Sequence, residues 1–139
     1  LGEAHHRGPV LLVWDEVKRE TRDPEHGHNV VFHEFAHKLD MLDGSADGTP
    51  LLPTPEEYQR WSEVCSKEYL ELCERVEHGR PTFFDSYAAT DEAEFFAVVT
   101  ETFFCKPENM KHQHPKLYQV LQDFYRQDPA QKVSTNRLP

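Results

Sequence analysis

Two histidines and a glutamate stand at the spacing expected of a metal-dependent hydrolase. His33, Glu34 and His37 form an H-E-x-x-H motif. Residues four apart on a helix lie on the same face, so both imidazoles can bind one zinc ion. Glu34 then lies beside the open position of the metal, where it can act as a general base. The motif therefore predicts metal-assisted hydrolysis, most often of a peptide bond.

The residues around the motif argue against an ordinary surface helix with two histidines. Apolar side chains cover most of its circumference, and a helix of that kind is expected to be buried. Burying His33, Glu34 and His37 without partners would cost several kcal/mol, and a metal accounts for their presence. The apolar residues of this segment are Val30, Val31, Phe32, Phe35, Ala36 and Leu39.

A catalytic zinc usually takes three protein ligands and one water, so a third ligand must lie elsewhere. The extended form H-E-x-x-H-x-x-G-x-x-H is absent, because Asp40 and Asp43 occupy the places of its glycine and third histidine. The remaining common solution is a glutamate on a second, downstream helix. Glu94 is the favoured candidate, because a carboxylate in so apolar a segment needs a partner. Glu101, seven residues later on the same face, is the second candidate.

Three of these carboxylates have rival interpretations. If Asp91 is a helix N-cap, Glu94 can reach back to it in a capping box, which would place Glu94 on the surface. Glu101 is then either the ligand or a partner that orients a ligand. Asp40 either accepts a hydrogen bond from a ligand histidine or satisfies the helix end and the loop that contains Gly44 and Gly48. The sequence alone leaves these alternatives open.

Helices of different length are expected to position the motif. We predict helices over residues 28–41, from Thr54 to about residue 77, from residue 90 or 91 to about 105, and after Pro115. Thr54 is the expected N-cap of the second helix, with Pro55 in its first turn and Glu57 completing a capping box. Residues 42–54 and 80–90 are expected to be connectors, and the tail from residue 128 is expected to fray.

The sequence predicts strands in its first 14 residues and in no other segment. Residues 1–14 are expected to form a β-hairpin, because residues 9–14 are apolar and β-branched, and residues 15–27 a loop. The expected fold is thus α+β and mainly helical, with a small N-terminal sheet and residues 1–139 in one domain. Residues 10–14 could then be an edge strand that pairs with an extended peptide.

Composition limits the partners and the compartment. A net charge of −10, with no basic stripe, predicts no nucleic-acid partner. No apolar run approaches a membrane span and the start shows no signal peptide, so no membrane partner is expected. Three cysteines without a C-x-x-C pair do not suggest a disulfide framework, and they favour the cytoplasm.

Three segments, residues 8–14, 27–42 and 85–104, together resemble the Mlc titration factor A family of gluzincin-type zinc metallopeptidases. The resemblance implies a zincin-like fold, one zinc ion bound by His33, His37 and Glu94, and Glu34 as general base. Tyr87 matches a tyrosine near the family's cleft, where a phenol could donate a hydrogen bond to an oxyanion. A cleft-wall aromatic is the other interpretation of Tyr87.

The predicted function is therefore a zinc-dependent metallopeptidase acting on a peptide or protein. The alternatives are a zinc-containing module that sequesters a regulatory protein partner, with little or no peptidase activity, and a zinc hydrolase with another substrate. The resemblance implies such a partner, because the family includes a bacterial protein that sequesters a glucose-responsive repressor. Repressor binding is not carried over, because residues 55–78 diverge and the family's longer N-terminal region is absent.

Overall fold

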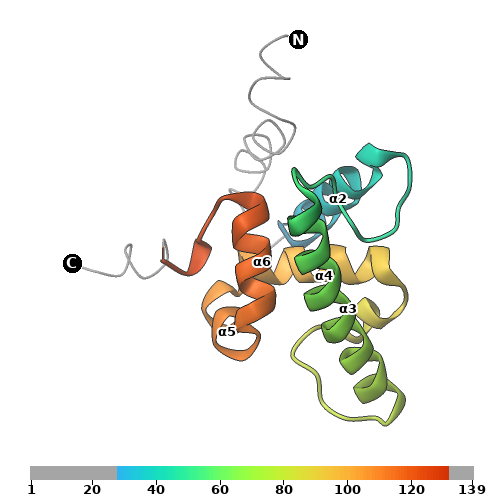
Figure 1. Ribbon diagram of the computed structural model, residues 1–139. Coiled ribbons are helices and arrows are strands. Elements are labelled where there is room, and N and C mark those ends of the chain that lie inside the picture. The colour runs from blue at the N-terminus through green and yellow to red at the C-terminus, as the bar shows by residue number, and fades with distance from the viewer. Residues whose placement is uncertain (1–27, 132–139) are drawn as a thin grey trace, which may run out of the picture.

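The structure is a computed structural model that describes residues 28–131 (Figure 1). Its longer helices are α2 (His28–Asp40), α3 (Pro55–Glu77), α4 (Glu92–Cys105), α5 (Pro107–Gln113) and α6 (Pro115–Tyr125). There are also two short 3-10 helices in the described residues. η1 (Met41–Asp43) directly follows α2, and η2 (Ser86–Ala89) directly precedes α4. The predicted helices are thus confirmed to within about two residues at their ends, and α5, η1 and η2 were not predicted.

The predicted α+β class is wrong, because residues 28–131 contain helices and no strand. The apolar segments of this part pack helix against helix, so no sheet is needed to cover them. The expected hairpin at residues 1–14 and the loop at residues 15–27 lie outside the described residues. The mainly helical part of the prediction is confirmed.

Local capping chemistry explains where the helices begin. The Thr54 hydroxyl accepts a hydrogen bond from the Glu57 N–H at 3.1 Å, and Pro55 occupies the first turn of α3. Asp91 caps α4 in the same way, and its carboxylate accepts from the Glu94 N–H at 2.8 Å. α5 and α6 each begin at a proline, which needs no backbone donor there.

The core is built around α4, the yellow to light-orange helix that crosses the middle of Figure 1. It packs against α2, η2, α5 and α6, and half of its residues are buried. α3 meets it through aromatic rings: Trp61 lies edge-on to Phe96, with ring centroids 5.6 Å apart, and to Phe124 of α6 at the same distance. The buried residues of α4 are Phe95, Phe96, Ala97, Val98, Val99, Thr100 and Phe103.

The closest helix pair, α2 and α4, runs antiparallel. Phe32 near the start of α2 stacks on Phe104 near the end of α4, with ring centroids 4.8 Å apart and planes inclined by 11°. His37, near the end of α2, contacts Glu94, near the start of α4. This register places the H-E-x-x-H segment directly against the helix that carries both candidate glutamates.

The end of the described chain docks on α6. The Tyr118 hydroxyl donates to the Asp128 carboxylate and accepts the Ala130 N–H at 3.0 Å, and Ala130 is buried. Residues 128–131, which were expected to fray, are therefore held by a side chain of α6. No helix between residues 28 and 131 combines the length and the apolarity needed to cross a membrane.

Candidate metal centre

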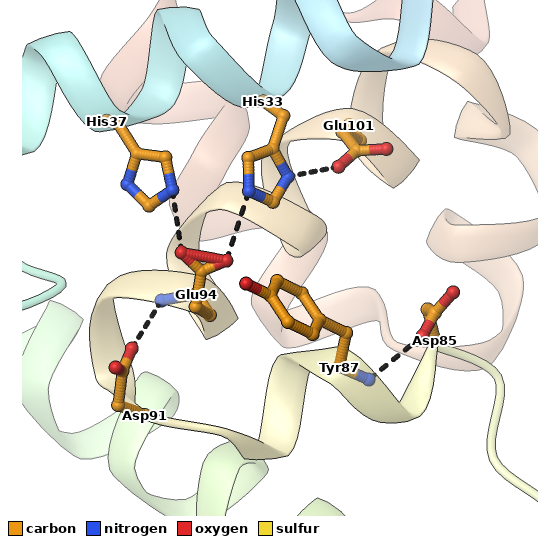
Figure 2. Close-up of polar contacts among 7 residues, drawn as sticks. All are labelled: His33, His37, Asp85, Tyr87, Asp91, Glu94 and Glu101. Carbon is orange, nitrogen blue, oxygen red and sulfur yellow. Dashed lines mark hydrogen bonds and ion pairs between the residues drawn. The ribbon is translucent and has the colours of Figure 1, made fainter.

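α2 brings His33 and His37 together on one face, as the four-residue spacing predicts. Their ring centroids lie 4.8 Å apart, and both side chains are mostly buried. Both direct their Nε2 atoms toward α4 (Figure 2). Glu34 follows His33 on the same helix and is exposed to solvent.

The Glu94 carboxylate lies between the two imidazoles (Figure 2). Its Oε1 is 2.8 Å from Nε2 of His37, and its Oε2 is 3.1 Å from Nε2 of His33. Only half of the alternative capping box forms, because Asp91 accepts the Glu94 N–H while the Glu94 side chain turns to the histidines. Glu94 is therefore neither a cap nor a surface residue.

These three side chains form a candidate metal site. Two imidazole nitrogens and one carboxylate oxygen are common zinc ligands, with bonds of about 2.0–2.2 Å. Tetrahedral ligands on such bonds are separated by roughly 3.3–3.5 Å. One ligand atom from each of His33, His37 and Glu94 can be chosen so that all lie within 4.8 Å of one another. A small shift of side chains would bring them to zinc-binding distances.

Glu101 contacts the other nitrogen of His33. Its Oε1 atom is hydrogen-bonded to Nδ1 of that ring, on the side away from Glu94 (Figure 2). A carboxylate in this position holds a proton on Nδ1 and leaves Nε2 with a lone pair for a metal. Of the two glutamates left open by the sequence, Glu94 is the one that contacts both histidines.

Tyr87, on η2, lies beside His33 and Glu94 (Figure 2). Its hydroxyl points toward the Glu94 carboxylate (Figure 2), and its ring centroid is 6.2 Å from that of His33. The Tyr87 N–H is anchored by Asp85 at 2.9 Å, while 53% of the residue is exposed. The negative charge of Glu94, and a hydrogen bond to it, raise the pKa of Tyr87. The phenol is therefore protonated at neutral pH and able to donate.

Asp40 adopts the second of its two predicted roles. Its side chain is fully buried, and both carboxylate oxygens accept the Gly48 N–H, at 3.0 and 2.9 Å. Burial raises the pKa of Asp40, although the Gly48 N–H opposes that rise. Asp40 therefore holds the loop after α2, and the orienting carboxylate on His33 is Glu101 instead.

A small cavity adjoins the cluster. It has a volume of about 160 Å³ and is shared with the cluster through Glu101. Its walls combine an aromatic ring, aliphatic atoms and polar groups of both charges, so it can accept a side chain of a bound molecule. The other lining residues are Phe83, Asp85, Val98, Thr102, Cys105 and Lys106.

Comparison with known proteins shows the family to which the chain belongs. Residues 1–126 match the model of the glucose-regulated metallo-peptidase M90 family. The chain belongs to this family. The resemblance predicted from the sequence is thus confirmed, because proteins named Mlc titration factor A are among its relatives. The metallo-peptidase family and the His-His-Glu cluster together indicate a candidate metal site at His33, His37 and Glu94.

Several relatives match most of the chain at moderate sequence identity. An uncharacterized protein of Synechocystis is 46% identical over 92% of the chain and 47% of its own length. Mlc titration factor A of Salmonella schwarzengrund is 36% identical over 97% of the chain and 51% of its own length. The Klebsiella pneumoniae protein of that name is 37% identical over 99% of the chain and 52% of its own length. The chain thus spans about half the length of the curated relatives it matches.

Proposed function

We propose that this M90 chain carries the zinc site of a metallopeptidase and hydrolyses peptide bonds. The observation that supports the proposal best is the Glu94 carboxylate lying between the Nε2 atoms of His33 and His37. These three residues would hold one zinc ion. When bound, zinc would supply Lewis acidity, polarising a scissile carbonyl and lowering the pKa of a water molecule.

The protein's own residues have separate roles in this proposal. Glu34, exposed beside the two histidines, accepts a proton from the attacking water and passes it to the leaving amine. Tyr87 donates a hydrogen bond from its protonated hydroxyl to the substrate carbonyl oxygen as negative charge develops there. Glu101 keeps the Nδ1 proton of His33 in place. The cavity beside Glu101 would receive a side chain of the peptide.

The compartment follows from the thiols. No disulfide joins any of Cys65, Cys73 and Cys105. Cysteines that form no disulfide suit a reducing compartment, so we place the protein in the cytoplasm. Its substrates would then be cytoplasmic peptides or proteins.

A Glu34→Gln variant tests the proposal. Glutamine keeps the size of glutamate but accepts no proton, so zinc content should stay at the parent level while peptide hydrolysis falls by about 10²–10⁴-fold. The assay is a panel of short fluorogenic peptides, with and without a chelator, beside metal analysis of both proteins. Cleavage that resists the chelator, or full activity in Glu34→Gln, would contradict the proposed mechanism.

The relatives' name favours a second candidate. Proteins called Mlc titration factor A suggest a chain that binds a regulatory protein. In that case the metal would stabilise the fold and Glu34 would have no catalytic task. Binding of such a partner that is unchanged in Glu34→Gln, together with no cleavage of any peptide by the zinc-loaded parent, would favour this candidate over the peptidase.

A further inference from the structure

The loop after α2, which leads to α3, contacts both helices that carry the proposed ligands. It leaves α2 through η1, and Gly48 returns to the fully buried Asp40 side chain, one turn beyond His37. Both oxygens of Asp40 accept the same N–H, at 3.0 and 2.9 Å. The middle of the loop is thereby fixed to the end of α2.

The same glycine presses against the start of α4. A Cβ atom added to Gly48 would lie 2.7 Å from the carbonyl carbon of Glu92 and closer still to its oxygen. Gly48 also has a φ of +82°, which side-chain-bearing residues rarely adopt. Both the conformation and the close approach therefore require glycine. Glu92 is the first residue of α4 and stands two residues before Glu94.

The loop contact lies at one end of the ligand cluster. At the other end, Phe32 of α2 stacks on Phe104 of α4. His37 and Glu94 lie at the end held by Asp40 and Gly48. Displacing Gly48 from Glu92 would thus change the separation of His37 and Glu94 before it changed the stacked end.

From these contacts we propose that Asp40 and Gly48 are positioning residues for the metal site. We call the chain of contacts from Asp40 through Gly48 to the Glu92 backbone the α2–α4 clamp. The clamp sets the spacing at which His37 and Glu94 share one ion, although neither Asp40 nor Gly48 touches the ion. This inference rests on the proposed zinc site, and it assigns to the loop a task beyond covering the core.

The test compares Gly48→Ala with Gly44→Ala. Gly44 has a similar φ of +90°, but a Cβ there would meet no atom within 4 Å. Both variants suffer the same kind of backbone strain, and only Gly48→Ala pushes against α4. The zinc dissociation constant of each is measured by competition with a chromophoric chelator. We expect a rise of about tenfold or more for Gly48→Ala and none for Gly44→Ala.

Crystal structures of the zinc-free variants provide a readout that does not depend on metal. Gly48→Ala should lengthen the His37 Nε2 to Glu94 Oε1 separation beyond its present 2.8 Å, while Phe32 stays stacked on Phe104. Equal zinc affinities and unchanged His37–Glu94 separations in both variants would overturn the clamp. If the parent binds no zinc, the proposed function fails, and the crystal structures alone decide on the clamp.

Asp40→Asn and Asp40→Ala supply the same test if Gly48→Ala does not fold. Asparagine keeps one oxygen that can accept the Gly48 N–H, whereas alanine keeps none. The clamp predicts that zinc affinity falls further in Asp40→Ala than in Asp40→Asn. Equal zinc affinities in the parent and both variants, despite a lower unfolding temperature, would assign Asp40 to stability alone.

Discussion

Nδ1 of His33 is hydrogen-bonded to the carboxylate of Glu101, a residue 68 positions away in the sequence. A carboxylate at Nδ1 favours the proton on that nitrogen, and Nε2, on the other side of the ring, lies 3.1 Å from Oε2 of Glu94. The hydrogen bond to Glu101 joins α2 to α4 on the side of the ring away from the proposed ligands. Its contribution can therefore be measured separately from that of the ligands themselves.

We expect Glu101→Ala to weaken zinc binding by about 10–100-fold without abolishing it, because His33 loses the partner that orients it. Glu101→Gln keeps an oxygen that can accept the Nδ1 proton, so it should recover most of that loss. Zinc dissociation constants of the two variants check this, with the exposed Glu77→Ala as control. An affinity in Glu101→Ala equal to that of the parent would contradict the role.

Glu94→Ala should lose zinc far more completely than Glu101→Ala. The substitution removes the carboxylate that contacts both histidines and leaves two protein ligands, fewer than a catalytic zinc site normally has. Metal analysis after dialysis against buffer without zinc should find the ion in the parent and none in the variant. If Glu94→Ala kept its zinc and Glu101→Ala lost it, the third ligand would be Glu101.

Tyr87→Phe should lower kcat by up to about 10²-fold with little change in KM or zinc content. A donor that acts on developing charge contributes mainly in the transition state. Steady-state kinetics on the best peptide of the panel measures the split, and Tyr58→Phe on the exposed surface of α3 is the matched control. A rise in KM alone would indicate that Tyr87 lines the cleft and does not donate to the oxyanion.

Asp40 should make the stability of the fold fall as pH rises. Burial raises its folded-state pKa above the ordinary 3.8, so the folded protein holds a proton that the unfolded chain has released. The contribution is complete below pH 3.8 and is lost as pH rises through the folded pKa. Urea unfolding of the parent and Asp40→Asn over this interval should show the parent losing stability relative to the variant. A relative gain would mean that the Gly48 N–H outweighs burial.

Cys65 and Cys105 should react slowly in the folded protein. Burial, with smaller contributions from Glu68 and Glu101, raises the pKa of each to about 12. At pH 8 only about one thiol in ten thousand is then a thiolate, which is the reactive form. Iodoacetamide labelling followed by peptide mass analysis should show slow modification of both thiols, and rapid modification in urea. Equal rates in the two conditions would contradict the burial argument.

Local chemistry explains what could be predicted from the sequence. Thr54, Pro55 and Asp91 act on backbone groups within three residues, so the starts of α3 and α4 could be predicted from the sequence. The pairing of His33 with His37 follows from one turn of helix. α5 was missed because seven residues between two prolines show no apolar stripe, although Pro107 is itself a helix-start signal.

The parts that could not be predicted depend on contacts between distant segments. Glu94 and Glu101 lie on one face of α4, so periodicity cannot rank them, and only the antiparallel register with α2 separates their partners. The contact of Gly48 with Glu92 has no local signal beyond the presence of a glycine. The α+β class was inferred from residues 1–14, whereas residues 28–131 fold as helices alone.

The antiparallel pairing of α2 with α4 has a consequence for chain topology. His37 and Glu94 are separated by 57 positions, and all of α3 lies between them. An ion bound by both would act as a cross-link that closes this loop, comparable in the chain-entropy description to a disulfide worth about 4 kcal/mol. In the same description, removing the ion would lower the free energy of unfolding of the whole fold, α3 and Trp61 included, although α3 supplies no ligand. Trp61 fluorescence would then report events at a centre that it does not touch.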